Sequence, residues 1–290
     1  MGCDGGLGQA GTLPGVSPFR ASAAFTESWD HLRFEITDGV GVITFDRPDR
    51  LNALTYDTYA DLRDLLAEVE HRDDVRVLVI TGEGRGFCSG GDVEEIIGDL
   101  QGSDTKKLLE FARLTGSVVA GIRRVPIPVI AAVNGVAAGA GSVIALAADL
   151  RIVAESASFQ FLFTKVGLAG ADMGSAYLLP RVVGLGRASE MLLFGDPVTP
   201  EHARTAGLAN EVVPDAELMT VTMEKARRLA DGPSMAYGVT KVLLGRELDM
   251  DLASSIELEA YTQALMMTSE DHREFYEAFT AKREPNWRGR

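Results

Sequence analysis

Two segments rich in small residues are the strongest candidates for chemistry in this chain. One covers residues 86–92, Gly-Phe-Cys-Ser-Gly-Gly-Asp, and the other covers 134–141, Asn-Gly-Val-Ala-Ala-Gly-Ala-Gly. Each follows an apolar run typical of a β-strand (75–81 and 128–133) and precedes a segment that we expect to be helical. Small residues let a ligand approach the main chain, and helix N-termini add positive potential. Two such loops can aim two backbone N–H groups at one oxygen, an arrangement that stabilises an enolate or another oxyanion.

One glycine-rich loop alone would mean less, because such loops also bind phosphate groups or simply turn the chain. Cys88, inside the first loop, raises the alternative of a nucleophilic thiol. A nucleophile needs a basic partner, and none of the four histidines lies near Cys88 in the sequence. We therefore interpret Cys88 as a small packing residue.

The elements that position these loops alternate between strand and helix. Apolar residues alternate through 31–46 on both sides of Asp38-Gly39, which predicts a hairpin. Helical spacing of apolar residues follows at 56–69 and 108–122, around the strand predicted at 75–81. The segment 142–148 is small and apolar on all sides, which indicates a buried helix. This order predicts an α/β fold.

After the buried helix the pattern changes. Short strands are predicted at 150–153 and 157–161, and from Gly186 onward the pattern is helical throughout. We predict three parts: an N-terminal extension without stable structure (1–28), an α/β core (29–200) and an α-helical C-terminal region (201–290).

Composition excludes several classes of function. The 290 residues carry a net charge of −14, which argues against nucleic acid or an anionic membrane as the main partner. No apolar run approaches the roughly 20 residues that a membrane span needs. The two cysteines, Cys3 and Cys88, provide no disulfide framework for the folded part, which fits a reducing, cytoplasmic location. We see no metal-binding motif.

Four segments in order carry a resemblance to a known family: 47–54 (Arg-Pro-Asp-Arg-Leu-Asn-Ala-Leu), 86–92, 130–135 (Ile-Ala-Ala-Val-Asn-Gly) and 178–184 (Leu-Leu-Pro-Arg-Val-Val-Gly). From about residue 30 to the end, the chain resembles the crotonase superfamily, the enoyl-CoA hydratase/isomerase family. The resemblance implies a core spiral of repeated ββα units and C-terminal helices that build a homotrimer, or a hexamer of two trimers. It also implies an acyl-coenzyme A thioester as substrate, with no prosthetic group.

The resemblance implies roles for individual residues. The thioester oxygen would lie between the backbone N–H groups of Ser89 and Ala140. Lys282 belongs to a segment that would reach the nucleotide end of coenzyme A from an adjacent subunit, although a solvated helix end is an equally good interpretation. The residues implied in binding coenzyme A are Asn52, Ala53, Leu54, Gly90, Gly91, Asp92, Phe279 and Lys282.

The chain departs from the family at the two glutamates that its hydratases use to add water. Their places are taken by Val143 and Phe163. Neither side chain can move a proton, so the two-glutamate hydratase mechanism is not open to this sequence. Aromatic residues at 159, 161, 163 and 177 suggest a pocket wall or, equally, the core of a strand. Glu94 and Glu95 are candidate second acids or, more commonly, surface residues.

One carboxylate remains at a catalytic position of the superfamily. With the sequences aligned on residues 178–181, Asp172 matches the aspartate of dienoyl-CoA isomerases and related enzymes. Alternatively, Asp172 caps the helix that starts near Gly174. A single acid/base facing an oxyanion hole suits a proton shift between two carbons, which is isomerisation. The alternatives are hydration through water held by Asp172, nucleophilic attack by Asp172 as in hydrolases or dehalogenases, and a non-catalytic acyl-CoA-binding protein.

Overall fold

The computed structural model of the chain describes residues 24–290. The extension predicted over 1–28 therefore lies outside the described residues, apart from 24–28, which form no helix or strand.

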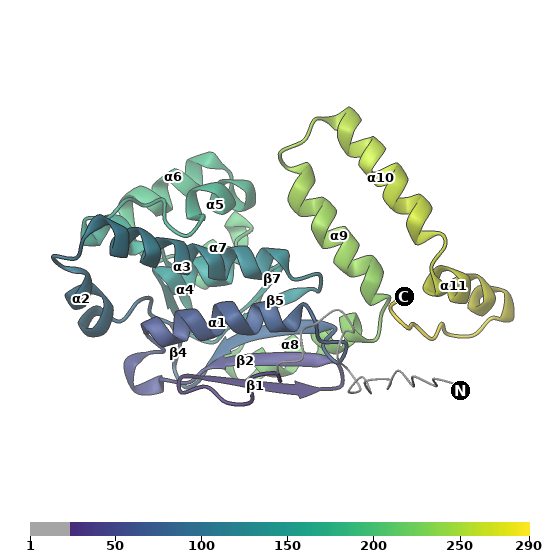
Figure 1. Ribbon diagram of the computed structural model, residues 1–290, viewed down its shortest axis with the longest axis horizontal. Coiled ribbons are helices and arrows are strands. Elements are labelled where there is room, and N and C mark those ends of the chain that lie inside the picture. The colour runs from purple at the N-terminus through teal and green to yellow at the C-terminus, as the bar shows by residue number, and fades with distance from the viewer. Residues whose placement is uncertain (1–23) are drawn as a thin grey trace, which may run out of the picture.

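A six-stranded sheet forms one half of the core (Figure 1). Its first two strands form the predicted antiparallel hairpin, whose turn residues Asp38 and Gly39 have left-handed φ angles of 52° and 77°. Every later strand in this sheet pairs in parallel with its neighbour. In spatial order the strands are β1 (Leu32–Thr37), β2 (Val40–Phe45), β3 (Val77–Gly82), β5 (Val129–Val133), β7 (Leu150–Ala154) and β9 (Glu211–Val213).

A second, smaller parallel sheet contains β4 (Gly86–Cys88), β6 (Val136–Ala138) and β8 (Ser158–Gln160). Each of these strands directly follows a strand of the large sheet, so the chain alternates between the two sheets before it enters a helix. The predicted spiral of ββα units is confirmed. Two of the short strands lie inside segments that the sequence presents as loops, because three residues are too few to show an alternating pattern.

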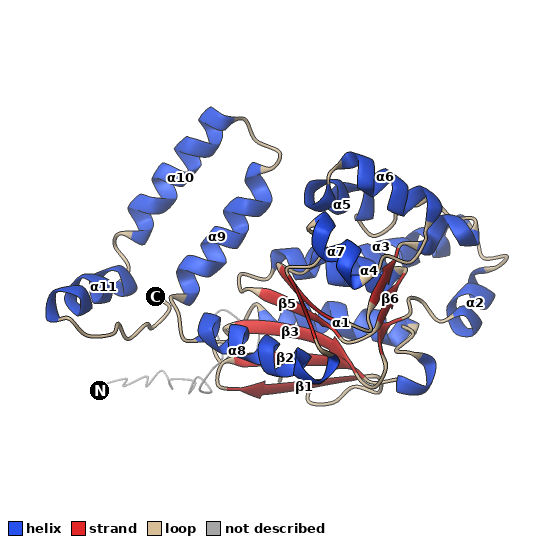
Figure 2. Cartoon of the chain, turned by 180° about the vertical axis from the view of Figure 1, so that it is seen from behind, coloured by secondary structure: helices blue, strands red, loops and turns tan. Residues whose placement is uncertain are grey.

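The helices of the core follow from capping signals and apolar spacing. Helix α1 (Tyr56–Val69) begins at a capping box between Thr55 and Thr58, and α3 (Thr105–Arg124) begins at Asp104, whose side chain accepts from Lys107 N–H. Helix α4 (Ala140–Ala147) is buried along its whole length, as predicted. Helices α1 and α3 cover one face of the large sheet and α8 (Leu218–Ala230) covers the other (Figures 1 and 2).

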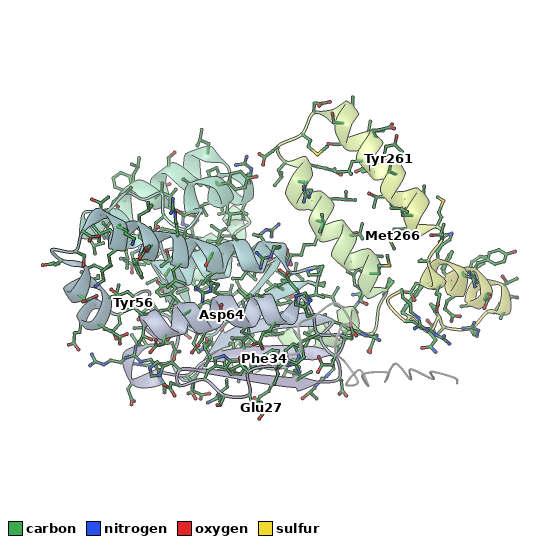
Figure 3. The ribbon with its side chains drawn as sticks, viewed as in Figure 1. Glu27, Phe34, Tyr56, Asp64, Tyr261 and Met266 are labelled. Carbon is green, nitrogen blue, oxygen red and sulfur yellow. The ribbon has the colours of Figure 1, made fainter. Side chains whose placement is uncertain are left out.

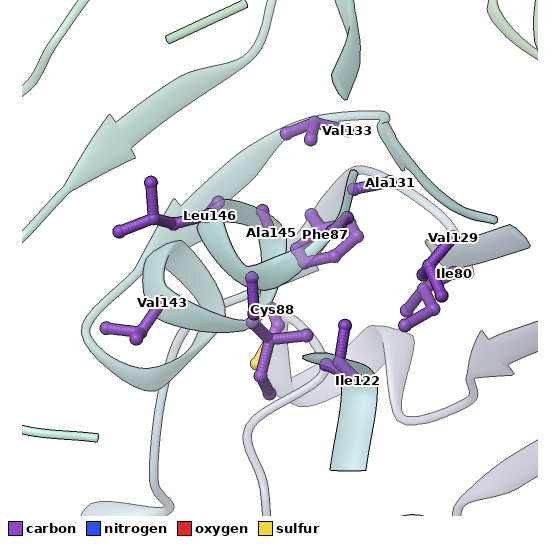
Figure 4. Close-up of a cluster of buried hydrophobic side chains, with 14 of the residues drawn as sticks. Ile80, Phe87, Cys88, Ile122, Val129, Ala131, Val133, Val143, Ala145 and Leu146 are labelled. Carbon is purple, nitrogen blue, oxygen red and sulfur yellow. The ribbon is translucent and has the colours of Figure 1, made fainter. Parts of the chain in front are cut away.

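Apolar side chains from both sheets and from the helices between them meet in one core. Figure 4 shows part of it, where Phe87 and Cys88 of the small sheet lie beside Ile80 and Val129 of the large sheet and Ile122 of α3. The buried side chains of the first loop, Phe87 and Cys88, therefore belong to this core.

Shorter elements complete the core. The prediction of helices throughout from Gly186 onward is wrong at β9, a three-residue strand that pairs with residues 152–154 of β7 and that only tertiary contact defines. The remaining elements are 3₁₀ turns at Pro48–Arg50, Leu162–Val166 and Asp215–Glu217, a π-helical turn at Val93–Ile97, and helices α2 (Gly98–Leu100), α5 (Ser175–Val183), α6 (Leu185–Phe194) and α7 (Pro200–Ala206).

Three C-terminal helices project away from both sheets (Figures 1 and 2). They are α9 (Ser234–Glu247), α10 (Leu252–Met266) and α11 (Glu270–Ala281), and we call residues 234–281 the C-terminal arm. Large apolar side chains on the arm are exposed, among them Leu252, Ile256, Tyr261, Leu265, Tyr276 and Phe279; Figure 3 labels Tyr261. Within residues 24–290, no helix is both long enough and apolar enough to cross a membrane.

Candidate active site

The structure brings the two glycine-rich loops together. Strands β4 and β6 are parallel neighbours, so the loops that leave their carboxyl ends start side by side. The contact at Gly141 is too close for a side chain, since a Cβ there would lie 2.1 Å from the carbonyl oxygen of Cys88. Gly90 has a φ of 101°, and a Cβ there would lie 3.1 Å from the carbonyl oxygen of Ala138, a tight contact. Glycine at these places is therefore needed for the two main chains to meet.

The two predicted amide donors differ in their present partners. Ala140 is the first residue of α4, so its N–H has no acceptor within the helix, and it makes no bond to any other residue that the structure describes. The N–H of Ser89 donates to the carbonyl oxygen of Leu51 at 3.0 Å. One donor is open to a ligand, and the other is engaged in holding the first loop against residue 51.

Leu51 and Asn52, in the segment before α1, hold the start of the first loop in place. Leu51 and Asn52 both have left-handed φ angles, 50° and 58°, which few side chains other than asparagine tolerate. The buried amide of Asn52 donates to the carbonyl oxygens of Glu83 at 3.0 Å and Gly86 at 2.7 Å. Asn134 also donates to the Gly86 oxygen, at 3.1 Å. Two asparagines thus lock the turn between β3 and β4.

Residues 53 and 54 continue this support. Leu54 is buried and pairs with the first loop as in a parallel bridge, since it donates to Gly90 at 2.8 Å and accepts from Asp92 N–H at 2.9 Å. Ala53 is half-buried, and its carbonyl oxygen accepts from Arg47. The part in coenzyme A binding predicted for residues 52–54 would therefore fall to their backbone.

Asp92 holds the end of the first loop. One carboxylate oxygen accepts from the N–H groups of Glu94 and Glu95 at 3.0 and 3.1 Å, and the other lies 3.1 Å from the Arg47 guanidinium. The Glu95 N–H, together with Arg47, lowers the pKa of this carboxyl group. Glu94 and Glu95 are themselves exposed, and Glu94 pairs with Arg50 at 3.1 Å, which favours their interpretation as surface residues.

Asp172 lies in the loop before α5 and is half-buried. Its carboxylate accepts from Met173 N–H at 2.8 Å, while its own N–H donates to Ser175 Oγ at 3.1 Å. Helix α5 has Gly174 as its N-cap, and no side chain caps it, so the capping interpretation of Asp172 is not supported. Burial raises the pKa of Asp172, partly offset by the Met173 N–H. A raised pKa suits a group that must both take and return a proton.

Tyr59 of α1 connects Asp172 with the first loop. Its hydroxyl oxygen lies 3.7 Å from where a Cβ on Gly91 would be. Burial raises the pKa of Tyr59 well above its usual value, and the charges of Cys88 and Asp172 add to the effect. Coulomb energy falls with distance, so this influence links Asp172 electrostatically to Tyr59, whose hydroxyl lies beside the first loop.

The two positions that the resemblance matches to the hydratase glutamates are apolar and buried. Val143 is fully buried in α4 (Figure 4), and Phe163 is 6% exposed. Phe159 and Phe161 are fully buried, which favours the core interpretation for both. Tyr177 is exposed on α5, with the Arg181 guanidinium 3.6 Å from its ring centre.

A cavity of about 720 Å³ lies between α3, α5 and α9. Met173 and Gly174, the two residues after Asp172, line it together with Gly116 of α3 and Lys241 of α9. In the part of the chain that the structure describes, no three His, Cys, Asp or Glu side chains are placed to hold a metal ion.

Two predicted residues lie elsewhere. Phe279 of α11 is 74% exposed, and Lys282 ends this helix with a left-handed φ of 52°. Both belong to the end of the chain that projects from the core (Figure 1), so one chain does not bring them to the loops. Their action on an adjacent subunit's ligand stays a prediction. Sequence reasoning missed Tyr59, whose position in an amphipathic helix made it look like any core residue.

The chain is similar to known proteins over most of its length. The family model described as enoyl-CoA hydratase/isomerase matches residues 35–290. A provisionally named enoyl-CoA hydratase of Rhodobacter capsulatus is 40% identical, over 91% of this chain and 100% of its own length. The 1,2-epoxyphenylacetyl-CoA isomerase of Escherichia coli is 38% identical, over 88% of this chain and 97% of its own length.

Solved structures give the same result. A provisionally named enoyl-CoA hydratase of Streptomyces coelicolor A3(2) superposes with a TM-score of 0.92 and 59% identity, over 94% of this chain and 100% of its own. The spiral core and its helical C-terminal region are thus those of the crotonase fold. The chain belongs to the enoyl-CoA hydratase/isomerase family.

Proposed function

We propose that the protein is an enzyme that moves a double bond in an enoyl- or dienoyl-CoA thioester, with Asp172 as the proton carrier. The observation that carries the proposal is the half-buried carboxyl group of Asp172, which acts electrostatically on Tyr59 beside the first loop, while Val143 and Phe163 offer no second acid. The names of the relatives include both a hydratase and an isomerase, and the missing glutamates favour isomerisation.

The reaction would run through a thioester enolate. The carbonyl oxygen accepts a hydrogen bond from Ala140 N–H at the start of α4, where the helix dipole also favours negative charge. The Asp172 carboxylate removes a proton from one carbon of the acyl group. The electron pair moves into the enolate and returns to the other end of the conjugated system, which takes the proton back from Asp172. A second donor becomes available if Ser89 N–H exchanges Leu51 for the thioester oxygen.

Coenzyme A would lie along the backbone of residues 52–54 and of the first loop. Asp92 orders that loop, because both of its carboxylate oxygens already have partners. The substrate itself supplies the thioester, and we propose no prosthetic group. Phe279 and Lys282 of an adjacent copy would reach the nucleotide end.

The exposed apolar side chains of the C-terminal arm support assembly into a trimer, or a hexamer of two trimers, since exposed patches of this kind mark interaction sites. Light scattering that finds only monomers at micromolar concentration would contradict this assembly. The reducing conditions implied by the two cysteines fit a cytoplasmic enzyme, and fractionation of cells would test the location.

Exchange of substrate protons with heavy water tests the mechanism. We expect the wild-type protein to exchange acyl protons of enoyl-CoA esters, and Asp172→Asn to lose about 10²- to 10⁴-fold in the rate of exchange and of double-bond shift. Glu94→Gln is the matched control, because it removes an exposed carboxylate beside the first loop. Full turnover by Asp172→Asn would sink the proposal. A 3-hydroxyacyl product in place of a shifted double bond would assign the protein to the hydratases.

A further inference from the structure

Tyr59 has a hydroxyl group that the mechanism does not use. Its side chain is 2% exposed, and its ring packs edge-on against Phe111 of α3, with the ring centres 5.8 Å apart. Within residues 24–290 the hydroxyl makes no hydrogen bond, but its oxygen is not fully buried and keeps contact with solvent. Tyr56, one turn earlier on α1, packs against the same ring at 5.5 Å, but its hydroxyl donates to Asp99. The Tyr59 O–H is therefore a donor on an otherwise buried side chain that a ligand can reach.

The Tyr59 hydroxyl lies next to the first loop. A Cβ on Gly91 would lie 3.7 Å from both the Tyr59 oxygen and Ile96 Cδ1, which is ordinary contact, so the absent methyl group leaves a gap of its own size between the main chain and the hydroxyl. Gly91 is itself half-buried, so the space reaches solvent. Burial keeps the pKa of Tyr59 high, and the group therefore remains a neutral O–H donor at every working pH.

We propose that Tyr59 donates a hydrogen bond to an oxygen carried by the acyl group, and that the site thereby selects oxygen-bearing acyl chains, such as hydroxy, oxo or epoxide derivatives. The inference rests on the proposed function only in placing the acyl group at the first loop. A plain hydrocarbon chain would displace water and leave the hydroxyl unpaired. Sites built to hydrogen-bond a substrate oxygen reject analogues that lack it much more strongly than apolar pockets discriminate by size.

Binding of unreactive esters tests this selection without any turnover. We would measure, by titration calorimetry, the affinities of hexanoyl-CoA and of its 4-oxo, 5-oxo and 6-hydroxy derivatives, in which the oxygen lies beyond the carbon that a hydratase would act on. For the wild-type protein, at least one oxygen-bearing ester is expected to bind about tenfold or more tightly than hexanoyl-CoA, the gain of one buried hydrogen bond. Since the esters do not react, this result is independent of any proton transfer by Asp172.

Two matched variants locate the effect. Tyr59→Phe keeps the ring that packs on Phe111 and should abolish the preference, with hexanoyl-CoA bound as tightly as before or more tightly. Tyr56→Phe should retain the preference, because its hydroxyl is engaged by Asp99.

Two results would overturn the proposal. One is equal affinity of the wild-type protein for every ester in the series, which needs no variant to fold. The other is a preference that survives in Tyr59→Phe. If Tyr59→Phe instead shifts the acid limb of the pH–rate profile and leaves the preference intact, the hydroxyl acts on Asp172 and does not contact the acyl group.

Discussion

The two glycine-rich loops have similar compositions but are held in different ways. The first is bonded on several sides: Ser89 N–H to Leu51, Gly90 and Asp92 to Leu54, and the Asp92 carboxylate to Arg47. The second, at Gly139 and Ala140, leads directly into α4 and leaves the Ala140 N–H without a partner among the residues described. The first loop is thus held in place by its bonds, and the second presents an N–H group without a partner. In an oxyanion hole of this kind, Ala140 N–H could bind the oxygen directly, whereas Ser89 N–H would first have to leave Leu51.

Among changes to the two loops, removing the open donor should have the largest effect. Ala140→Pro deletes the N–H at the first helical position, where proline is well tolerated, so α4 should persist. We expect kcat to fall about 10²- to 10³-fold, as for the loss of one oxyanion donor. Proton-exchange rates in heavy water measure the effect, with Ala140→Ser as the control that keeps the amide. Activity within a few-fold of wild type would show that this N–H does not hold the oxyanion.

Separating the loops should have the next largest effect. A Cβ at position 141 would lie 2.1 Å from the carbonyl oxygen of Cys88, so Gly141→Ala must push the loops apart. We expect a loss of about 1–3 kcal/mol in the free energy of unfolding, measured in urea, together with reduced activity. Gly116→Ala is the control: its Cβ meets nothing within 4 Å, and a helical Gly→Ala change should stabilise by about 0.5–1 kcal/mol. Equal stabilities of the two variants would refute the close contact.

The smallest effect should come from neutralising the Asp92 carboxylate, which pairs with Arg47 at the end of the first loop. Its contribution to the free energy of unfolding depends on pH. Asp92→Asn keeps a capping oxygen but loses the charge opposite Arg47, a loss of about 1–2 kcal/mol at pH 7. The folded-state pKa of Asp92 lies below its usual value of 3.8, so its stabilising contribution is complete above that pH and disappears as the pH falls through the folded pKa. Urea unfolding at pH 7, 5 and 3 checks this. A difference between the two proteins that persists undiminished at the lowest pH would contradict the assignment.

Much of the fold was predictable because its long elements have strong local signals. The boundaries of α1 coincide with the predicted 56–69, since capping residues and apolar spacing agree there. Strands β4, β6 and β9 were not predictable, because three residues carry no period and their partners are distant in the sequence. At the site, residue composition pointed to both loops. The bond from Ser89 to Leu51 was hidden, because it depends on a left-handed leucine that no pattern indicates.

Cys88 gives the first loop a further property. Its side chain is fully buried, and burial raises the pKa of its thiol to about 12, so the reactive thiolate is almost absent while the loop is closed. Electrophiles and oxidants should therefore leave the closed enzyme intact and modify Cys88 only in molecules whose loop has opened. Cys3 lies outside the described residues and would be replaced by serine, so that only Cys88 reacts. The rate of alkylation then measures how often the first loop opens and exposes Cys88.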